Sequence, residues 1–354
     1  MPQDTGSKAL TNHPLRGATV LITGGTGAWG RELTTQILES SDVKEVRVYS
    51  RGEHPQVLMR RKFSDSRLRF IVGDVRDKNI LGLAMKDVDY CFHLAALKHI
   101  PICEENTWEA ILTNIYGTQN IIECAIANGV KMVVDASSDK AVDPFNLYGV
   151  TKACGEKMIV NANQNYTSDT RFVCVRGGNV VGTTGSVMPL FKQQIKENNG
   201  ITITDPDMTR FLMSTKQAIG LVLKAVERAV GGELFVMKMP ATSLSTLADT
   251  MIRLLGNDET TKETIGRRPG EKKHEALISR HESPFAKDIG DDYYVLLPQF
   301  GGATCESVYA EYPSLPLEEF SSENAEQLDS KSLETMLRQE EWLFDPYATG
   351  PITL

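Results

Sequence analysis

The chain has 354 residues, of which 41% are hydrophobic and 24% are charged, as is ordinary for a soluble globular protein. Its length allows one large domain, or two closely packed ones, with a substantial hydrophobic core. The net charge of −8 has a local origin, because residues 305–354 contain eleven acidic and two basic residues. Binding nucleic acid requires a basic face, so nucleic acid is not expected as a partner.

The sequence also argues against a membrane protein, a metal site and a disulfide framework. No apolar run approaches the roughly 20 residues that a bilayer-spanning helix needs. Residues 1–16 read as a polar tail that lacks the apolar core of a secretory signal. The six cysteines are scattered without a C-x-x-C pair, which suits a reducing cytoplasm and gives no zinc-binding spacing. We therefore expect a cytoplasmic protein without a metal ion.

From residue 18 onward, short β-branched segments alternate with longer helical ones. Strands are expected at 18–25, 45–50, 68–75, 88–96, 132–138 and 171–180. Helical spacing of apolar positions is found between them, as at 28–40, 106–129 and 148–166. This alternation predicts an α/β protein with a Rossmann-like, doubly wound parallel sheet.

The alternation breaks down after about residue 177, and this change predicts the domain boundaries. Residues 17–176 are expected to form the Rossmann domain, to which segments near 210–235 return. Residues 177–280 begin with a glycine-rich, polar stretch and are expected to form a smaller, discontinuous lobe over the C-terminal edge of the sheet. Residues 281–354 are interpreted as an acidic C-terminal extension.

The loop after the first strand, TGGTGAWG at residues 23–30, has its glycines in a G-x-x-G-x-x-G arrangement. Glycines let the backbone turn sharply and approach a pyrophosphate, which then binds at the helix N-terminus. A glycine pattern alone is weak, but here it lies between a strand and a helix near the chain start, so a dinucleotide site is favoured. The candidate contacts in this loop are Gly24, Thr26, Gly27, Ala28, Trp29 and Gly30.

The end of the second strand indicates which dinucleotide binds. An acid there would bind the ribose 2′-hydroxyl of NAD. This chain has Ser50 and Arg51 instead, a hydroxyl and a guanidinium that suit a 2′-phosphate. NADP is therefore the expected cofactor, and the nearby Glu53 keeps NAD possible.

Further candidates lie at the ends of the third and fourth strands. Asp74 and Val75 follow the third strand, where a carboxylate can accept a hydrogen bond from the adenine amine. After the fourth strand, Ala95 and Ala96 permit close approach of the cofactor, and Lys98 is expected to point toward the cleft. Folds of this class bind ligands at the C-terminal ends of their strands, so the shared placement of these residues supports a cofactor site.

A candidate catalytic set follows the fifth strand. Tyr148 and Lys152 lie at positions i and i+4 of an expected helix, so they share one face. An ammonium beside a phenol favours the phenolate, which lowers the pKa of the tyrosine. Ser138, at the strand end, can hydrogen-bond the same substrate oxygen. Together the three side chains predict removal of a hydroxyl proton while a hydride leaves the same carbon for NADP⁺.

With these residues in place, the chain resembles an extended short-chain dehydrogenase/reductase and, within that superfamily, the UDP-N-acetylglucosamine 4,6-dehydratase (5-inverting) family. The resemblance covers residues 18 to about 280. It is carried by ITGGTGAWG, VYSR, GDVRD, AALKHIP, TNIYGTQN, SSDKAVDPFNLYGVTK, GNVVGTTGSVMPLF, ITDPDMTRF and GRRPGEKKHE. Ordinary sugar-nucleotide 4,6-dehydratases carry Asp-Glu where this chain has Asp139-Lys140, and the Asp-Lys pair marks the inverting branch.

The resemblance implies a reaction on UDP-N-acetylglucosamine that yields UDP-2-acetamido-2,6-dideoxy-β-L-arabino-hex-4-ulose. Oxidation at C4 acidifies the C5 proton, which a neutral Lys140 can remove. A protonated Asp139 can donate to the departing C6 hydroxyl, and the hydride then returns to C6. Alternatives are a retaining 4,6-dehydratase, a C5- or C4-epimerase of a UDP-sugar, and an NADP-binding regulator without turnover. Lys140 would need a depressed pKa, which burial and a nearby Lys98 could supply.

The same resemblance assigns the smaller lobe to substrate binding and adds Asn114 to the cofactor site. The implied substrate contacts are Lys98, Asn179, Val187, Met188, Pro189, Thr204, Arg210, Arg268 and Glu271. Members commonly assemble as homo-dimers or homo-hexamers, so a homo-oligomer is expected. Two departures stand out: Gly177 replaces a usual aromatic residue, and Asp135 lies in a normally apolar strand, where a buried carboxylate needs a partner.

Overall fold

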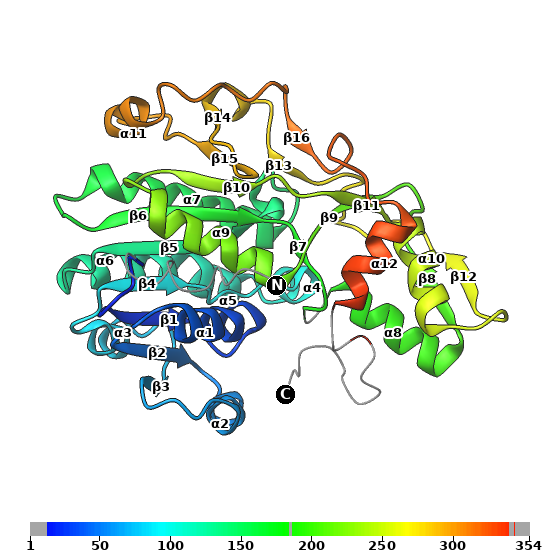
Figure 1. Ribbon diagram of the computed structural model, residues 1–354, viewed down its shortest axis with the longest axis horizontal. Coiled ribbons are helices and arrows are strands. Elements are labelled where there is room, and N and C mark those ends of the chain that lie inside the picture. Colours follow the sequence, from blue (N-terminus) through cyan, green and yellow to red (C-terminus); the bar gives the residue numbers. More distant parts are fainter. Residues whose placement is uncertain (1–12, 184–185, 340–342, 344–354) are drawn as a thin grey trace, which may run out of the picture.

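The computed structural model describes residues 13–183, 186–339 and 343. Most of the predicted polar tail and the last residues of the predicted acidic extension lie outside this range. A nine-stranded sheet forms the centre of the molecule (Figure 1). In spatial order its strands are β14 (Ala286–Asp288), β15 (Tyr293–Leu296), β10 (Leu234–Met237), β6 (Arg171–Gly177), β5 (Met132–Ser138), β4 (Tyr90–His93), β1 (Thr19–Thr23), β2 (Glu45–Ser50) and β3 (Leu68–Val72).

Seven adjacent strands, from β3 to β10, pair in parallel. The central strands are apolar runs, and every residue of β1 is buried, as expected of a parallel sheet covered on both faces. Helix α1 (Ala28–Ser40) packs against α9 (Thr215–Arg228), whereas α3 (Lys78–Met85), α6 (Gly117–Ala127) and α7 (Leu147–Asn165) form a second group. The predicted Rossmann-like α/β fold is confirmed.

The sheet differs from a wholly parallel one at one edge. Strands β14 and β15 pair antiparallel with each other, and β15 pairs antiparallel with β10. The turn between them contains Gly290, Asp291 and Asp292, all with positive φ, which supports a tight reversal. Residues 286–296 therefore extend the central sheet. The apolar strand YYVL supplies the burial that makes this pairing favourable.

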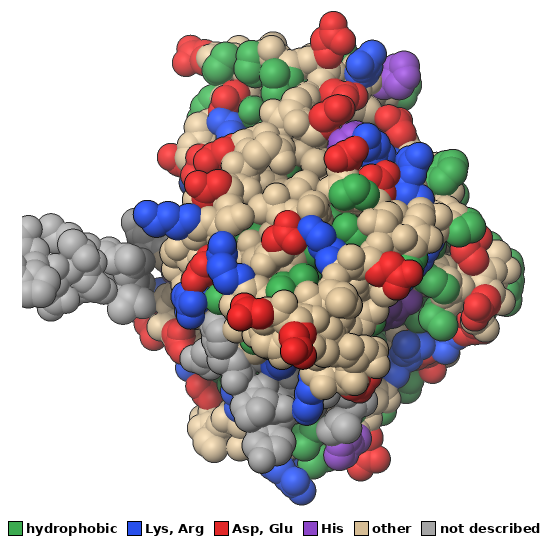
Figure 2. Space-filling view, turned by 90° about the vertical axis from the view of Figure 1, so that its right-hand side faces the viewer, with side chains coloured by type: hydrophobic (Ala, Val, Ile, Leu, Met, Phe, Trp, Pro, Cys, Tyr) green, Lys and Arg blue, Asp and Glu red, His purple; other side chains and the backbone are tan. Residues whose placement is uncertain are grey.

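The smaller lobe has its own hydrophobic core. It contains one sheet in the order β11 (Ala241–Ser243), β9 (Thr209–Met213), β7 (Asn179–Val180), and a parallel pair of β8 (Gly200–Ile203) with β12 (Thr261–Thr264). Helices α8 (Val187–Asn198), α10 (Leu244–Leu255) and α12 (Ser330–Arg338) pack around these strands (Figure 1). Their shared core includes Phe191, Leu247, Met251 and Leu333. On the face of the molecule that Figure 2 shows, acidic and basic side chains are interspersed.

A buried arginine joins the segment after residue 276 to the central sheet. Arg176, at the end of β6, is 1% exposed. Its guanidinium donates to both carboxylate oxygens of Glu156 on α7 and of Glu282, and to the carbonyl oxygen of Leu277. Leu277 lies in β13 (Ala276–Ile278), which pairs with β16 (Phe320–Ser321). This network fixes the position of β13, and with it the residue just before the strand, Glu275.

No helix within the described ranges is long and apolar enough to cross a membrane.

Candidate active site

A single cavity of about 1530 Å³ contains most of the predicted site residues. It lies where the C-terminal ends of the parallel strands meet the smaller lobe, as expected for ligand sites of this fold class. The predicted residues that line it are Gly24, Thr26, Gly27, Ala28, Trp29, Gly30, Ser50, Arg51, Asp74, Val75, Ala95, Ala96, Lys98, Ser138, Lys140, Tyr148, Asn179, Val187, Pro189, Thr204, Arg210, Arg268 and Glu271.

The glycine loop has the shape that a dinucleotide pyrophosphate requires. Gly24 has a φ of +64°, and a Cβ atom there would lie 2.8 Å from the backbone of Leu94 and Ala95. A Cβ atom at Gly30 would lie 2.4 Å from the backbone of Gly25. Helix α1 begins at Ala28, so its N-terminal amides face this loop. Side chains at the two glycines would obstruct the turn, and the loop as built fits a nicotinamide dinucleotide.

The ribose-adenine side of the cavity contains polar groups that already have protein partners. Gln56 Nε2 donates to Ser50 Oγ at 3.0 Å. Asp74 forms an ion pair with Arg76, with Oδ2 2.6 Å from the guanidinium, and the Arg76 amide donates to Oδ1. Arg51 is exposed at the rim of the cavity. Of these groups, the guanidinium of Arg51 is the one best placed to meet an added phosphate.

The loop after β4 is held by a residue that was predicted to touch the cofactor. Asn114 is 2% exposed and does not line the cavity. Its Oδ1 accepts the Leu97 amide and its Nδ2 donates to the Leu97 carbonyl, both at 2.8 Å, and to Thr151 Oγ1 at 3.0 Å. The Asn114 amide therefore fixes the loop that carries Ala96 and Lys98, and its contact with the cofactor stays a prediction.

Tyr148 and Lys152 lie in the first turns of α7, as predicted. The helix is capped by Asn146, whose Oδ1 accepts the Gly149 amide. Lys152 is buried and donates to Oδ2 of Asp135 at 3.4 Å, which supplies the partner that the sequence did not reveal. Burial lowers the pKa of Lys152, but Asp135 together with Tyr148, Cys174 and Glu156 outweighs burial, and the net direction is upward. The lysine is thus held as an ammonium.

The pKa of Tyr148 is raised, contrary to the sequence-based expectation. Burial of the phenol raises it most, whereas the charges of Lys152 and Lys140 and a hydrogen bond with Ser138 lower it. The phenol lines the cavity although it is only 8% exposed. In the free chain, burial therefore keeps Tyr148 protonated.

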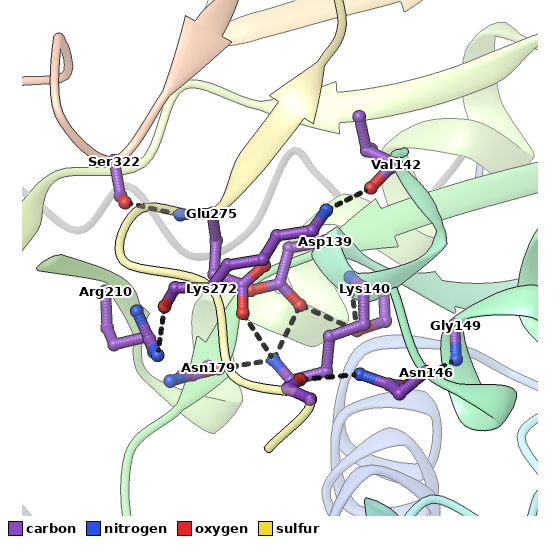
Figure 3. A network of polar contacts seen from close by, with 12 residues as sticks. Asp139, Lys140, Val142, Asn146, Gly149, Asn179, Arg210, Lys272, Glu275 and Ser322 are labelled. Atoms are coloured by element: carbon purple, nitrogen blue, oxygen red, sulfur yellow. Dashed lines mark hydrogen bonds and ion pairs between the residues drawn. The ribbon is translucent and has the colours of Figure 1, made fainter. Parts of the chain in front are cut away.

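Asp139 and Lys140 form the centre of a polar network (Figure 3). They lie in the short 3₁₀ helix Asp139–Ala141, directly after β5. Lys140 Nζ lies 3.0 Å from Asp139 Oδ1, 3.3 Å from Asn179 Oδ1 and 3.9 Å from Glu275 Oε1. Burial lowers the pKa of Lys140, but the carboxylates of Asp139 and Glu275 outweigh it, so the net direction is upward. The expected depression by burial and Lys98 is therefore wrong for the free chain.

Asp139 is the least accessible of these groups, with an exposed fraction of 0%. It does not line the cavity, but Ser138 and Lys140 do. Ser138 Oγ donates to Asp139 Oδ1 at 2.7 Å, the oxygen that also accepts from Lys140. Asp139 is therefore connected to the cavity through these two side chains.

The wall of the smaller lobe is lined by polar side chains from several elements. Arg210, on β9, donates to the carbonyl oxygens of Thr209, Lys272 and Lys273. These contacts fix the orientation of the guanidinium, and no carboxylate of the described residues forms an ion pair with it (Figure 3). The exposed Arg268 lies on the loop before β13. This wall therefore offers guanidinium groups, which suit a diphosphate.

Met188 does not line the cavity, and its contact with the substrate stays a prediction. It is 2% exposed and packs in the core of the smaller lobe. Met188, Phe191 and Ile195 follow one another at i, i+3 and i+7 on α8, which makes them the buried face of that helix. The neighbouring Val187 and Pro189 line the cavity instead.

Glu275 is a cavity-lining residue that sequence reasoning did not single out. It is 4% exposed, and its Oε1 faces the Lys140 ammonium. The available signal was its position immediately before the apolar strand Ala276–Ile278, in a segment whose other charged residues are more exposed. Among the residues that the structure describes, no group of three or more His, Cys, Asp or Glu side chains could hold a metal ion.

Comparison with known proteins shows the family of the chain. The family model described as "Polysaccharide biosynthesis protein" matches residues 20–296. The chain belongs to the polysaccharide biosynthesis protein family. It is 42% identical over 284 residues to UDP-N-acetylglucosamine 4,6-dehydratase (inverting) of Campylobacter jejuni, covering 80% of this chain and 83% of that protein. It is also 41% identical over 326 residues to UDP-glucose 4-epimerase of Rickettsia bellii, covering 90% of this chain and 95% of that protein.

Solved structures of related proteins agree with the fold. The structure of Pen from Bacillus thuringiensis has a TM-score of 0.85 and 40% identity, and covers 92% of this chain and 98% of that chain. DesIV, a dTDP-glucose 4,6-dehydratase from Streptomyces venezuelae solved with NAD and TYD bound, has a TM-score of 0.69. At 20% identity, with 93% of this chain and 99% of that chain covered, DesIV supports the fold alone. The chain is therefore a sugar-nucleotide-modifying enzyme of the short-chain dehydrogenase/reductase type.

Proposed function

We propose that the chain is an inverting UDP-N-acetylglucosamine 4,6-dehydratase that uses NADP. The observation that carries this proposal is the presence of two proton-transferring groups at one cavity: the phenol of Tyr148 and the amine of Lys140, which lies 3.0 Å from the Asp139 carboxylate. Removal of a proton and a hydride at C4 requires only the Tyr148 phenol. The Lys140 amine with its Asp139 neighbour allows a proton to be taken from C5 and water to be lost.

Tyr148 is assigned the C4 hydroxyl proton, with Ser138 hydrogen-bonded to the same oxygen. A bound nicotinamide dinucleotide would accept the C4 hydride and return it to C6, so none is consumed. Lys152 is buried and forms an ion pair with Asp135. Its charge lowers the pKa of the Tyr148 phenol, against the effect of burial, and so favours its action as a base. The glycine loop, the alanines after β4 and Arg51 would hold the cofactor.

Lys140 is assigned the C5 proton, and Asp139 supplies the proton that leaves with the C6 hydroxyl. Transfer of one proton from Lys140 Nζ to Asp139 Oδ1 converts the ammonium-carboxylate pair into a free amine and a carboxylic acid. These are the two species that elimination of water requires, and the 3.0 Å separation permits the transfer. Reprotonation of C5 from the opposite face would complete the inversion.

The remaining cavity residues are assigned to the UDP moiety and the sugar. Arg210 and Arg268 would contact the diphosphate, since guanidinium groups form charge-assisted hydrogen bonds with phosphate oxygens. Asn179 hydrogen-bonds Lys140 at the centre of the site and is assigned to the sugar. Glu271, Thr204, Val187 and Pro189 line the walls around these groups.

Homo-oligomer formation is a further part of the proposal. Trp108 on α5 (Thr107–Ile111) and Tyr116 at the end of the π-helix Leu112–Tyr116 are 59% and 53% exposed, and their rings are in contact. Ile102 on α4 (Ile100–Glu105) is 47% exposed. Apolar groups of this size are typical of an interface. Light scattering of the purified chain would show a dimer or hexamer.

The six free cysteines suit the reducing cytoplasm that we propose as the location of the protein.

Product analysis tests the proposed reaction against its rivals. Incubation with UDP-N-acetylglucosamine in D₂O is expected to give a 6-deoxy-4-keto sugar with deuterium at C5 and the C6 methyl group in the L configuration, as seen by NMR. A retaining dehydratase would give the D configuration. A C4-epimerase, which the Rickettsia relative favours, would give a 4-epimer that keeps its C6 hydroxyl and its C5 hydrogen. An absence of turnover would support the remaining alternative, an NADP-binding regulator.

A further inference from the structure

The backbone of Glu275 is held in place beside Asp139 and Lys140. Its backbone amide donates to Ser322 Oγ at 2.9 Å, and its carbonyl accepts the Ser322 amide at 2.7 Å. Arg176 secures the strand that follows it. These contacts fix the backbone of Glu275 and place its Oε1 3.9 Å from Nζ of Lys140 (Figure 3).

The two carboxylates around Lys140 are both incompletely satisfied. Asp139 Oδ2 and Glu275 Oε2 are buried and have no hydrogen-bond partner within the described part of the chain. Two carboxylates and one ammonium would leave a net negative charge in a buried site, which is costly. The nearby cations do not neutralise it directly, because Arg210 donates to carbonyl oxygens and Lys272 Nζ donates to the Val142 carbonyl. The arrangement favours a proton on one carboxyl group.

Glu275 is the carboxyl group that the surroundings favour for this proton. Burial raises its pKa and the negative charge of Asp139 raises it further, whereas Lys140, Arg210 and Lys272 lower it, and the net direction is upward. Asp139, in contrast, accepts hydrogen bonds from both Ser138 and Lys140.

We propose that Glu275 is a positioning residue whose protonation state decides whether Lys140 is held as an ammonium or released as a free amine. When Glu275 is neutral, Lys140 faces one carboxylate and can pass its proton to Asp139. When Glu275 is ionised, two carboxylates hold the ammonium, and abstraction of the C5 proton stops. This assignment of Lys140 as the C5 base rests on the proposed function. Other groups that act on Lys140 are Arg210, Lys98 and Tyr148.

Titration of Lys140 in the substrate-free protein tests the proposal without requiring turnover. Lysine labelled with ¹³C at Cε reports the charge of the amine by NMR, and a Lys140→Arg variant assigns the signal. In Glu275→Gln, which keeps the shape but cannot ionise, the pKa of Lys140 is expected to fall by about 1 to 3 units. Glu275→Asp keeps a titrating carboxyl group, and Glu263→Gln, on the exposed strand β12, is the matched control. An unchanged Lys140 pKa in Glu275→Gln would overturn the proposal.

The wild-type signal gives a second test, which holds even if the variant does not fold. The Lys140 resonance should show an additional inflection where Glu275 ionises, and a single inflection would overturn the proposal. In turnover, wild type and Glu275→Asp should lose C5 exchange as pH rises, whereas Glu275→Gln should retain it. If no 4-keto product forms with any variant, the proposed function fails, but the titration still decides the role of Glu275.

Discussion

The Nζ atom of Lys152 lies 3.4 Å from Oδ2 of Asp135, and both side chains are almost completely buried. The pair connects strand β5 to helix α7, one helical turn after Tyr148. Asp135 lies in the sheet interior, but it contributes to the site because it holds the Lys152 ammonium, whose charge lowers the pKa of the Tyr148 phenol.

Asp135→Asn should destabilise the protein. It leaves the Lys152 ammonium buried without an anion, so the free energy of unfolding should fall by about 3 kcal/mol at neutral pH. The pair raises the pKa of Lys152 above its ordinary 10.5, so its stabilisation is complete at neutral pH and is lost as pH rises through the raised value. Urea unfolding measures the change, with Asp258→Asn, at an exposed turn, as the control. Equal stability of the two variants would contradict this role.

The predictable parts of the site are those that depend on local spacing. The strand-glycine-helix pattern places the cofactor loop, and the i, i+4 spacing places Tyr148 and Lys152 on one helix face. The same reasoning could have placed Met188 in the core of the smaller lobe, because its spacing with Phe191 and Ile195 marks the buried face of the helix. Contacts between segments far apart in the chain gave no such signal. Glu275 meets Lys140 only because Arg176 and β16 fix β13 against the sheet.

The fold was predictable to the point where the strand alternation ends. The first six strands follow from apolar, β-branched runs, whereas their spatial order comes from the structure. The antiparallel edge was not predicted, because the acidic composition of residues 305–354 gives no information on how YYVL at 293–296 pairs. The sequence IGDDYYVLL does contain the signal, since a Gly-Asp-Asp turn followed by aromatic and β-branched residues indicates a hairpin.

Arg51 should determine the preference for NADP over NAD. A charge-assisted hydrogen bond to the 2′-phosphate contributes about 1.5 to 3 kcal/mol, so Arg51→Ala should weaken NADP binding by about 10- to 100-fold. The affinity for NAD should change little, since NAD lacks that phosphate. Calorimetric titration with both dinucleotides measures this, and Arg61→Ala, exposed on α2 (Glu53–Lys62), is the control. An equal loss of affinity for both cofactors would show that Arg51 does not read the phosphate.

At the cavity wall, the indole ring of Trp29 lies next to the backbone of Gly177. A Cβ atom at residue 177 would lie 3.3 Å from Cη2 of Trp29 and 3.4 Å from Sδ of Met213. Gly177→Phe should displace the indole and reduce cofactor affinity by about tenfold, because overpacking costs about 1 to 3 kcal/mol. Trp29→Ala in the Gly177→Phe background should recover most of the loss. A double-mutant cycle measures the coupling, and strictly additive effects would rule out this pairing.

The proposed mechanism depends most directly on Lys140 as the base that takes the C5 proton. The decisive measurement is the rate of deuterium incorporation at C5 of the sugar in D₂O, followed by NMR for wild type and Lys140→Gln with UDP-N-acetylglucosamine. Wild type should incorporate deuterium and form the methyl group. Lys140→Gln should do neither, while absorbance of the reduced nicotinamide still reports oxidation at C4. Exchange at C5 in Lys140→Gln at the wild-type rate would contradict the account.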